Sequence, residues 1–213
     1  MLALLPNDVP RRPDLVSLAA AEAKPVYAAH CASCHGAEMK GDVRIGAPNL
    51  SDGVWLYGSG NVTDIERTIL YGIRSGRGQA HNVTEMTAFG LDGMLTPGEI
   101  RDVVQYVLSL SHRPNLAEAA LSGREIFYNK GMCSDCHGPD GSGDNYYGSP
   151  NLTINVWNNG GDPDSLYRSI YSGVKHVCPA WYGVLPLEKI RALAVYLYSV
   201  SHSDSAAYPP RAS

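Results

Sequence analysis

The sequence lacks a long run of lysine and arginine, and its formal net charge is -4. Nucleic-acid binding needs a concentrated basic surface, so the composition argues against a nucleic-acid partner. A long apolar run is also missing, because the opening stretch 1–5 is far too short for a signal peptide or a membrane span. Phenylalanine is scarce, with two residues against 13 tyrosines and three tryptophans. Aromatic side chains with a polar edge are therefore expected to line any internal site.

Four of the five cysteines lie in two copies of a C-x-x-C-H run, Cys31–His35 and Cys133–His137. This run is the attachment signature of c-type haem. On a helix, positions i, i+3 and i+4 share a face, so two thiols and an imidazole can approach one porphyrin edge and its iron. One copy could be a zinc half-site or a redox pair, but two copies within a longer shared pattern predict two covalent haem c groups. The predicted thioether residues are Cys31, Cys34, Cys133 and Cys136, and the predicted proximal iron ligands are His35 and His137.

Covalent haem also predicts where the protein works. Thioether attachment takes place outside the cytoplasm, so the native precursor is expected to be exported and the chain to lie in the periplasm. The sequence is interpreted as a soluble piece whose export signal or membrane anchor has been removed. With four cysteines used, Cys178 is left alone, and a disulfide within the chain is not expected.

The length suits one large or two small globular domains, and an internal repeat favours two. The first haem motif, Pro48–Leu50 and Trp55 recur 102 residues later as the second motif, Pro150–Leu152 and Trp157. We predict an all-α chain with an N-terminal tether over 1–14, kept extended by prolines, and haem domains over 15–113 and 114–213.

The pattern of apolar residues predicts three helices in the first domain, with Gly-rich loops between them. Pro25 is expected to interrupt the first helix, and Thr63 to cap the second. A capping box over Thr96–Glu99, with proline at the first helical position, is expected to open the third. The predicted helices span 15–30, 63–73 and 97–111.

Each iron needs a second axial ligand, expected from a loop well downstream of the attachment motif. In the first domain Met86 stands between the middle and last helices and is the preferred ligand, with Met94 and His81 as alternatives. At the matching place in the second domain stands Cys178, with His176 or an open site as alternatives. Thioether ligation raises the potential of a haem and thiolate ligation lowers it, so the Met86 haem is predicted to be the better electron acceptor.

Three further pairs of residues recur in register and are predicted to surround the cofactors. The proline carbonyl groups are expected to accept the outer N–H of each proximal imidazole. The tryptophans are expected either to hydrogen-bond a haem propionate or to be core aromatics, and the arginines either to neutralise propionates or to face solvent. The pairs are Pro48 and Pro150, Trp55 and Trp157, and Arg67 and Arg168.

Several segments resemble one known family: Gly46–Leu50, Trp55–Gly58, the Met-x-Ala-Phe-Gly element at Met86–Gly90, and the Tyr-Val-Leu-Ser-Leu-Ser ending. They are similar to the dihaem subunit, of the FixP or CcoP type, of cbb3-type cytochrome c oxidases, over about 15–203. The resemblance implies two class I cytochrome c folds, an N-terminal membrane helix absent from this chain, a periplasmic location, and electron transfer from soluble carriers towards an oxidase. Cys178 departs from the family, which has methionine there.

Electron transfer between redox proteins is the predicted function, with oxidase subunits, a soluble cytochrome or a dehydrogenase as partners. The alternative is a dihaem enzyme with a His/Cys haem, such as a thiosulfate dehydrogenase or a peroxidase. The two differ in turnover with thiosulfate or peroxide, which only the enzyme would show. A sensor would need a signalling domain, and the sequence contains no such domain.

Overall fold

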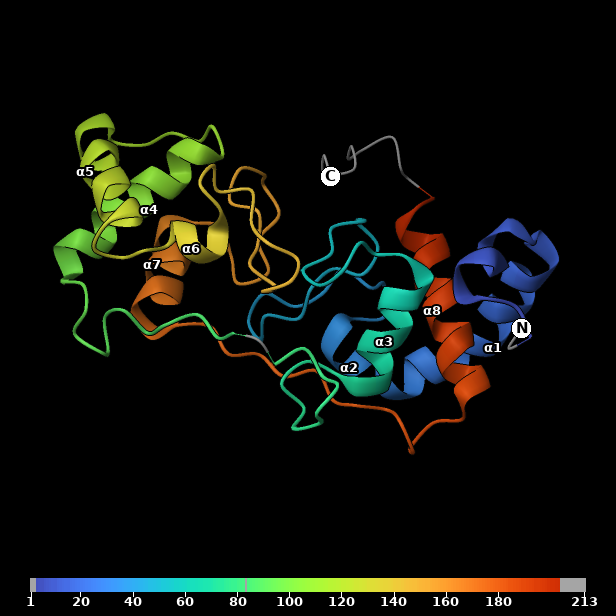
Figure 1. The fold of residues 1–213 in the computed structure, drawn as a ribbon. Helices are drawn as coiled ribbons and strands as arrows, with labels where there is room; N and C mark the ends of the chain where they lie inside the picture. Colours follow the sequence, from blue (N-terminus) through green and yellow to red (C-terminus); the bar gives the residue numbers. More distant parts are fainter. Residues whose placement is uncertain (1–2, 83, 204–213) are drawn as a thin grey trace. The chain divides into compact units, whose positions relative to one another are not determined.

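The computed structural model describes residues 3–82 and 84–203 (Figure 1). Helices account for its regular structure, and extended pairing in the described part is confined to isolated bridges. None of the helices in that part is both long and apolar enough to cross a membrane. In chain order the elements are η1 (Pro6–Arg11), α1 (Pro13–His30), α2 (Ala32–His35), α3 (Val62–Tyr71), α4 (Pro97–Leu110), α5 (Ala117–Tyr128), α6 (Ser134–His137), α7 (Pro163–Ser172) and α8 (Leu187–Ser201).

These elements form two compact units, and the chain crosses from one unit to the other after Asn82 and again after Lys175. The Cys31 unit consists of η1, α1, α2, α3 and α8, and the Cys133 unit consists of α4, α5, α6 and α7. The expected domains, 15–113 and 114–213, follow the sequence repeat and not these units. Each unit takes its haem motif and middle helix from one repeat and its last helix from the other.

In the Cys31 unit α1 packs against α8, as the blue and red helices of Figure 1 show. The buried face of α1 is small, with Ala19, Ala23 and Tyr27 at helical spacing. Alanine at such positions lets two helices approach closely. The α8 face against it is apolar along 192–195, and its residues share one core with α1 and α3. The last helix of the second repeat therefore closes the core behind the first haem motif.

In the Cys133 unit α4 packs against both α5 and α7. Ile100, Val103 and Phe127 are almost fully buried in the shared core. Gly123 on α5 lies directly against the backbone of Asp102 on α4, where any Cβ would overlap the carbonyl oxygen. This close approach requires glycine, so the α4–α5 contact is specific to these two helices.

The predicted capping box of α4 is confirmed, since Glu99 N donates to Thr96 Oγ1 and Thr96 N donates to the Glu99 carboxylate. The expected cap of α3 is wrong: Asn61, and not Thr63, accepts from the backbone at the helix start. Pro25 lies inside α1, which continues through it.

The N-terminal prolines do not hold the chain extended. Pro6 occupies the first position of η1, where its missing N–H costs nothing, and Val9 of this short helix is fully buried. The segment packs on α1, α3 and α8 and is part of the Cys31 unit.

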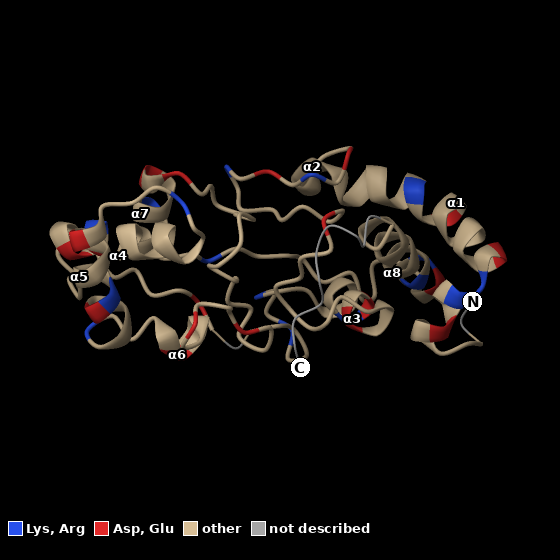
Figure 2. Cartoon of the chain, turned by 90° about the horizontal axis from the view of Figure 1, so that it is seen from above, with Lys and Arg blue, Asp and Glu red and all other residues tan. Residues whose placement is uncertain are grey.

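Charges of both signs occur along α1 and α5 (Figure 2). Among the described residues one ion pair is buried: Arg191 on α8 donates from Nε to the Glu66 carboxylate on α3 at 2.6 Å. It joins helices from different sequence repeats within the Cys31 unit.

Candidate functional site

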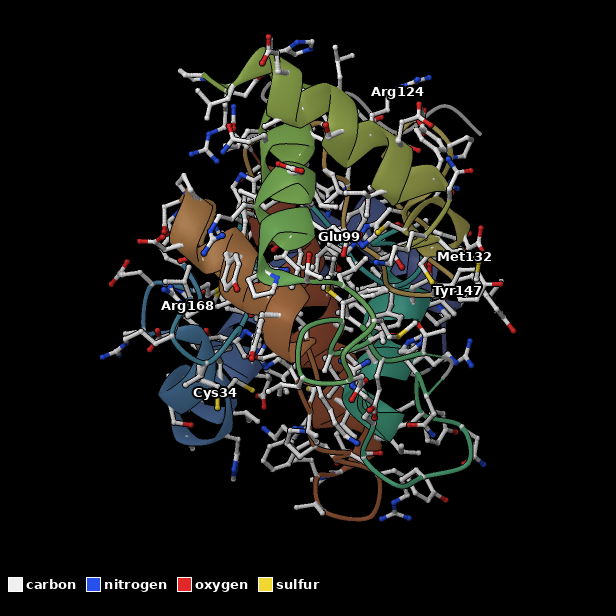
Figure 3. All side chains as sticks on the ribbon, turned by 90° about the vertical axis from the view of Figure 1, so that its left-hand side faces the viewer. Cys34, Glu99, Arg124, Met132, Tyr147 and Arg168 are labelled. Atoms are coloured by element: carbon white, nitrogen blue, oxygen red, sulfur yellow. The ribbon has the colours of Figure 1, made fainter. Side chains whose placement is uncertain are left out.

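Both haem motifs form a single helical turn, α2 and α6. The His35 N–H donates to the Cys31 carbonyl at 3.0 Å, and the His137 N–H donates to the Cys133 carbonyl at 2.9 Å. This i to i+4 bond places each imidazole one turn beyond the first thiol, as covalent attachment requires. Figure 3 shows the exposed Cys34 on its segment. All five cysteines are free thiols.

The two imidazoles are oriented in the same way. His35 Nδ1 lies 3.0 Å from the Pro48 carbonyl oxygen, and His137 Nδ1 lies 3.2 Å from that of Pro150. A carbonyl only accepts, so Nδ1 carries the proton and Nε2 keeps a lone pair for a metal. Burial lowers the pKa of both imidazoles and keeps them neutral, although the proline contact opposes this slightly. The contacts expected of the prolines are both present.

The tryptophans carry the clearest sign of a missing partner. Trp55 Nε1 and Trp157 Nε1 are buried without a hydrogen-bond acceptor. A buried N–H left unpaired costs about 1–3 kcal/mol, so such a pair at equivalent positions points to an acceptor from a bound group. A haem propionate is an acceptor of the right chemistry, and the residues present fit the cofactor that the motifs predict.

Burial makes three of the cysteine thiols harder to ionise. Burial raises the pKa of Cys31, Cys133 and Cys178 to about 11 each. For Cys178, the thiols of Cys31 and Cys34 raise the pKa further.

The segments expected to supply the distal ligands pair with the chain just after each middle helix. Ile73 follows α3 and exchanges two backbone hydrogen bonds with Cys178, at 2.9 and 3.0 Å. Val174 follows α7 and exchanges two with Met86, both at 3.3 Å. Cys178 thus belongs to the unit of His35, whereas Met86 belongs to the other unit.

This grouping differs from the sequence-based one, which assigned Met86 to the first haem motif and Cys178 to the second. The reason is that the two repeats carry the same pattern, so either distal segment fits either middle helix. Nothing in the linear sequence separates a segment that folds back on its own repeat from one that crosses to the other.

The alternative ligands have other contacts or lie exposed. His81 stacks on Tyr57 with ring centroids 4.5 Å apart, and its Nε2 lies 3.2 Å from Thr68 Oγ1. Met94 is 47% exposed. His176 lies in the Cys31 unit.

Arg67 and Arg168 are exposed, and Arg168 on α7 donates to Ser165 Oγ at 2.7 Å (Figure 3). A different arginine reaches the interior of the Cys31 unit. Arg74 donates to Tyr57 Oη at 3.1 Å and to the His176 carbonyl at 2.7 Å. A basic residue, Lys175, stands at the equivalent place after α7, and this repeat is the signal by which the sequence could have identified Arg74.

When bound, haem c supplies reversible one-electron chemistry at iron. The chain's own residues orient the imidazoles, keep them neutral and surround the site with apolar side chains.

Comparison with known proteins finds cytochrome c domains in both halves of the chain. The cytochrome c family model matches residues 20–111, and the model of cytochrome c oxidase, cbb3-type, subunit III matches residues 118–197. The cbb3-type cytochrome c oxidase subunit FixP of Bradyrhizobium sp. (strain ORS 278) is 41% identical over 194 residues, which cover 91% of this chain and 65% of the relative. Subunit CcoP of Cereibacter sphaeroides is 36% identical over 192 residues, covering 90% and 64%.

The chain therefore spans about 65% of the length of such relatives. The predicted all-α fold of two cytochrome c domains and the two haem c cofactors are confirmed. This protein is a dihaem c-type cytochrome that resembles the FixP and CcoP subunits of cbb3-type oxidases over most of its length.

Proposed function

We propose that this cytochrome transfers electrons on the periplasmic side of a membrane, from a redox donor towards the catalytic subunits of a cbb3-type oxidase. The observation that carries the proposal is the pair of haem motifs with identically oriented imidazoles, in a chain 36–42% identical to proteins named as cbb3 oxidase subunits. The periplasmic location follows from the site of thioether formation. Partners would be oxidase subunits together with a soluble cytochrome or a dehydrogenase.

In this proposal the cysteines of both motifs hold the porphyrins, and His35 and His137 are the proximal ligands. Cys178 and Met86 would be the second ligands of the two irons. With both ligands in place, substrate would have no coordination site, and the haems would supply outer-sphere electron transfer. The buried tryptophan N–H groups would bind propionates and so fix the cofactor in its pocket.

A second function is favoured by one observation, the cysteine at position 178. A thiolate-ligated haem in a dihaem protein fits an enzyme that oxidises a sulfur compound or reduces peroxide. Such an enzyme needs a ligand that leaves the iron during turnover. The backbone of Cys178 is tied to Ile73 by two hydrogen bonds, which favours a fixed ligand and hence the carrier function.

Stopped-flow kinetics on the purified dihaem protein tests the proposal. We expect reduction by a reduced soluble c-type cytochrome and reoxidation by a cbb3 oxidase core that lacks its own dihaem subunit. We expect no steady-state turnover with thiosulfate or hydrogen peroxide. Sustained turnover with either compound, or failure of the oxidase core to reoxidise the protein, would overturn it.

A further inference from the structure

We propose that the Cys31 unit binds a redox protein through an apolar face over residues 177–187, and that this partner presents acidic side chains around an apolar centre. The inference rests on the proposed electron-transfer function and names the class of partner that this unit accepts. The face belongs to the segment that carries Cys178, one of the proposed iron ligands. Three observations support it: the exposure of the segment, the arginines beside it and the lack of acidic residues in both.

The segment from Val177 to Leu187 is exposed although it is apolar. Its eleven residues include no charged side chain, no side-chain amide and no aliphatic hydroxyl. Val177 and Val184 are 61% and 63% exposed, and Tyr182 and Leu187 are both 48% exposed. Single exposed apolar side chains are common on protein surfaces, but several within one short segment are typical of a surface that binds another protein.

A tight turn before α8 holds the centre of this face in place, in the orange connection of Figure 1. The N–H of Val184 donates to the Trp181 carbonyl at 3.0 Å, and the N–H of Tyr182 donates to the Leu70 carbonyl of α3 at 2.9 Å. Gly183, between them, has φ +79°, and no atom beyond its chain neighbours lies within 4 Å of an added Cβ. The tip of the turn therefore projects from the unit on a fixed backbone.

A loop that is specific to the first repeat lies against this turn. The chain takes 15 residues to pass from the end of α3 to Met86, but only six to pass from the end of α7 to Cys178. Arg77 is in the longer connection, where it is exposed, and its Nη2 donates to the Tyr182 carbonyl at 3.4 Å. The added loop thus places a positive charge beside the apolar side chains.

The surroundings of the face are basic. Residues 67–82 contain three arginines, Arg67, Arg74 and Arg77, and no aspartate or glutamate. Arg74 donates to the His176 carbonyl at 2.7 Å, directly before the apolar segment. The first acidic residue after the segment is Glu188, in the first turn of α8. A partner therefore gains attraction by placing acidic side chains opposite the arginines.

Two other occupants fit the face less well. Anionic membranes are bound by clusters of about four to eight basic residues, which is more than this face carries. In a symmetric pair of copies the same arginines would meet across the interface, where like charges are unfavourable. A protein with an acidic rim matches both the apolar segment and the arginines.

The equivalent turn of the Cys133 unit provides an internal comparison. Leu91 and Met94 are 65% and 47% exposed there, but Asp92 lies between them in the chain, and the connection after α7 is the short one. Of the two turns, that of the Cys31 unit combines apolar side chains with arginine. The other turn therefore supplies matched control positions.

Stopped-flow reduction of the dihaem protein tests the charge of the face. The donors are two reduced soluble c-type cytochromes of similar potential, one with an acidic docking surface and one with a lysine-rich surface. We expect the acidic donor to react faster, with a rate constant that falls as salt is added. R77E should lower this rate constant about tenfold. R124E makes the same change of net charge in the Cys133 unit and should leave the rate constant within about twofold.

Equilibrium binding tests the apolar part without electron transfer. Surface plasmon resonance with the zinc-substituted acidic cytochrome, which is redox-inactive in the dark, measures association and dissociation. V184S should raise the dissociation rate about threefold or more, because apolar contacts act mainly after encounter. L91S, at the equivalent turn, should leave it unchanged. Both low-spin haem signals in low-temperature EPR of the oxidised variants would show that the haem sites are intact.

The outcomes separate this proposal from the proposed function. Equal effects of R77E and R124E, a faster reaction with the lysine-rich donor, or no binding of the zinc-substituted acidic cytochrome would overturn the acidic partner and leave electron transfer standing. Binding that R77E and V184S weaken, without reduction by either donor, would support the face and contradict the proposed function. Binding to phosphatidylglycerol vesicles, or dimerisation in sedimentation velocity, that V184S abolishes would assign the face to another occupant and overturn the proposal.

Discussion

The buried ion pair between α3 and α8 gives a quantitative test of which helix closes the first unit. Glu66 and Arg191 are 9% and 8% exposed, and their charged atoms are 2.6 Å apart. Removing one partner of such a pair leaves a buried charge and costs about 3–5 kcal/mol of unfolding free energy. We expect E66L and R191M each to lose that amount.

The double variant E66L/R191M should lose much less unfolding free energy than the two single variants added together, because neither charge is then buried without its partner. The coupling expected is about 3 kcal/mol, at the upper end for residues in contact. Arg191 also donates to the Leu4 carbonyl at 3.1 Å, so R191M should cost somewhat more than E66L. Urea unfolding of the oxidised dihaem protein, followed by circular dichroism and haem absorption, measures each value.

Arg101 is the matched control, since it holds the place on α4 that Arg191 holds on α8. If α3 were closed by α4 of its own repeat, Glu66 would meet Arg101. We expect E66L and R101M to be additive within about 0.5 kcal/mol. Additive effects for Glu66 with Arg191, or strong coupling of Glu66 with Arg101, would refute the helix exchange.

Three further predictions concern single positions. C178M should raise the reduction potential of one haem only, because a neutral thioether no longer stabilises ferric iron; an unchanged value in a spectroelectrochemical titration contradicts it. G72A should destabilise the protein by about 1–3 kcal/mol through strain at φ +75° and overlap with the next segment. G76A, at φ +80° with nothing within 4 Å, is its control and should cost less and leave both EPR signals intact. Lys130, and then Thr96, lower the pKa of Glu99 from 4.5 to about 2. The Glu99 carboxylate therefore contributes its full stabilisation above the pKa it has in the unfolded chain, and this contribution is lost as the pH falls towards 2. E99Q should accordingly lose less unfolding free energy between pH 5 and pH 3 than the unmodified protein. An identical pH profile of stability would exclude this role.

The sequence was sufficient for features that depend on near neighbours. The capping box at Thr96 follows from two side chains three residues apart, and the haem motif from three side chains on one turn. The carbonyl acceptor at Pro48 was also predictable, because proline has no N–H of its own. In both repeats a proline also follows the motif histidine at the same sequence separation. In each case local chemistry leaves few alternatives.

Features that depend on distant partners were not predictable. The apolar faces of α4 and α8 follow the same spacing, so periodicity cannot decide which N-terminal helix each one covers. The short helix η1 was also not predicted from the sequence. The three prolines between Pro6 and Pro13 suggest an extended segment unless the burial of Val9 is known. Sequence patterns specify the elements, whereas their partners depend on the connections between them.

The Cys133 unit is one uninterrupted stretch of chain, whereas the Cys31 unit is assembled from two stretches on either side of it. Folding order follows from this connectivity. The uninterrupted stretch can close as soon as Lys175 has been made, since its helices α4 and α5 are neighbours along the chain. The other must wait for α8, which follows Lys175 in the chain, and its ends are joined across a much longer loop. The attachment motif at Cys31 precedes the other motif in the chain but is enclosed later, which gives the attachment machinery longer access to it.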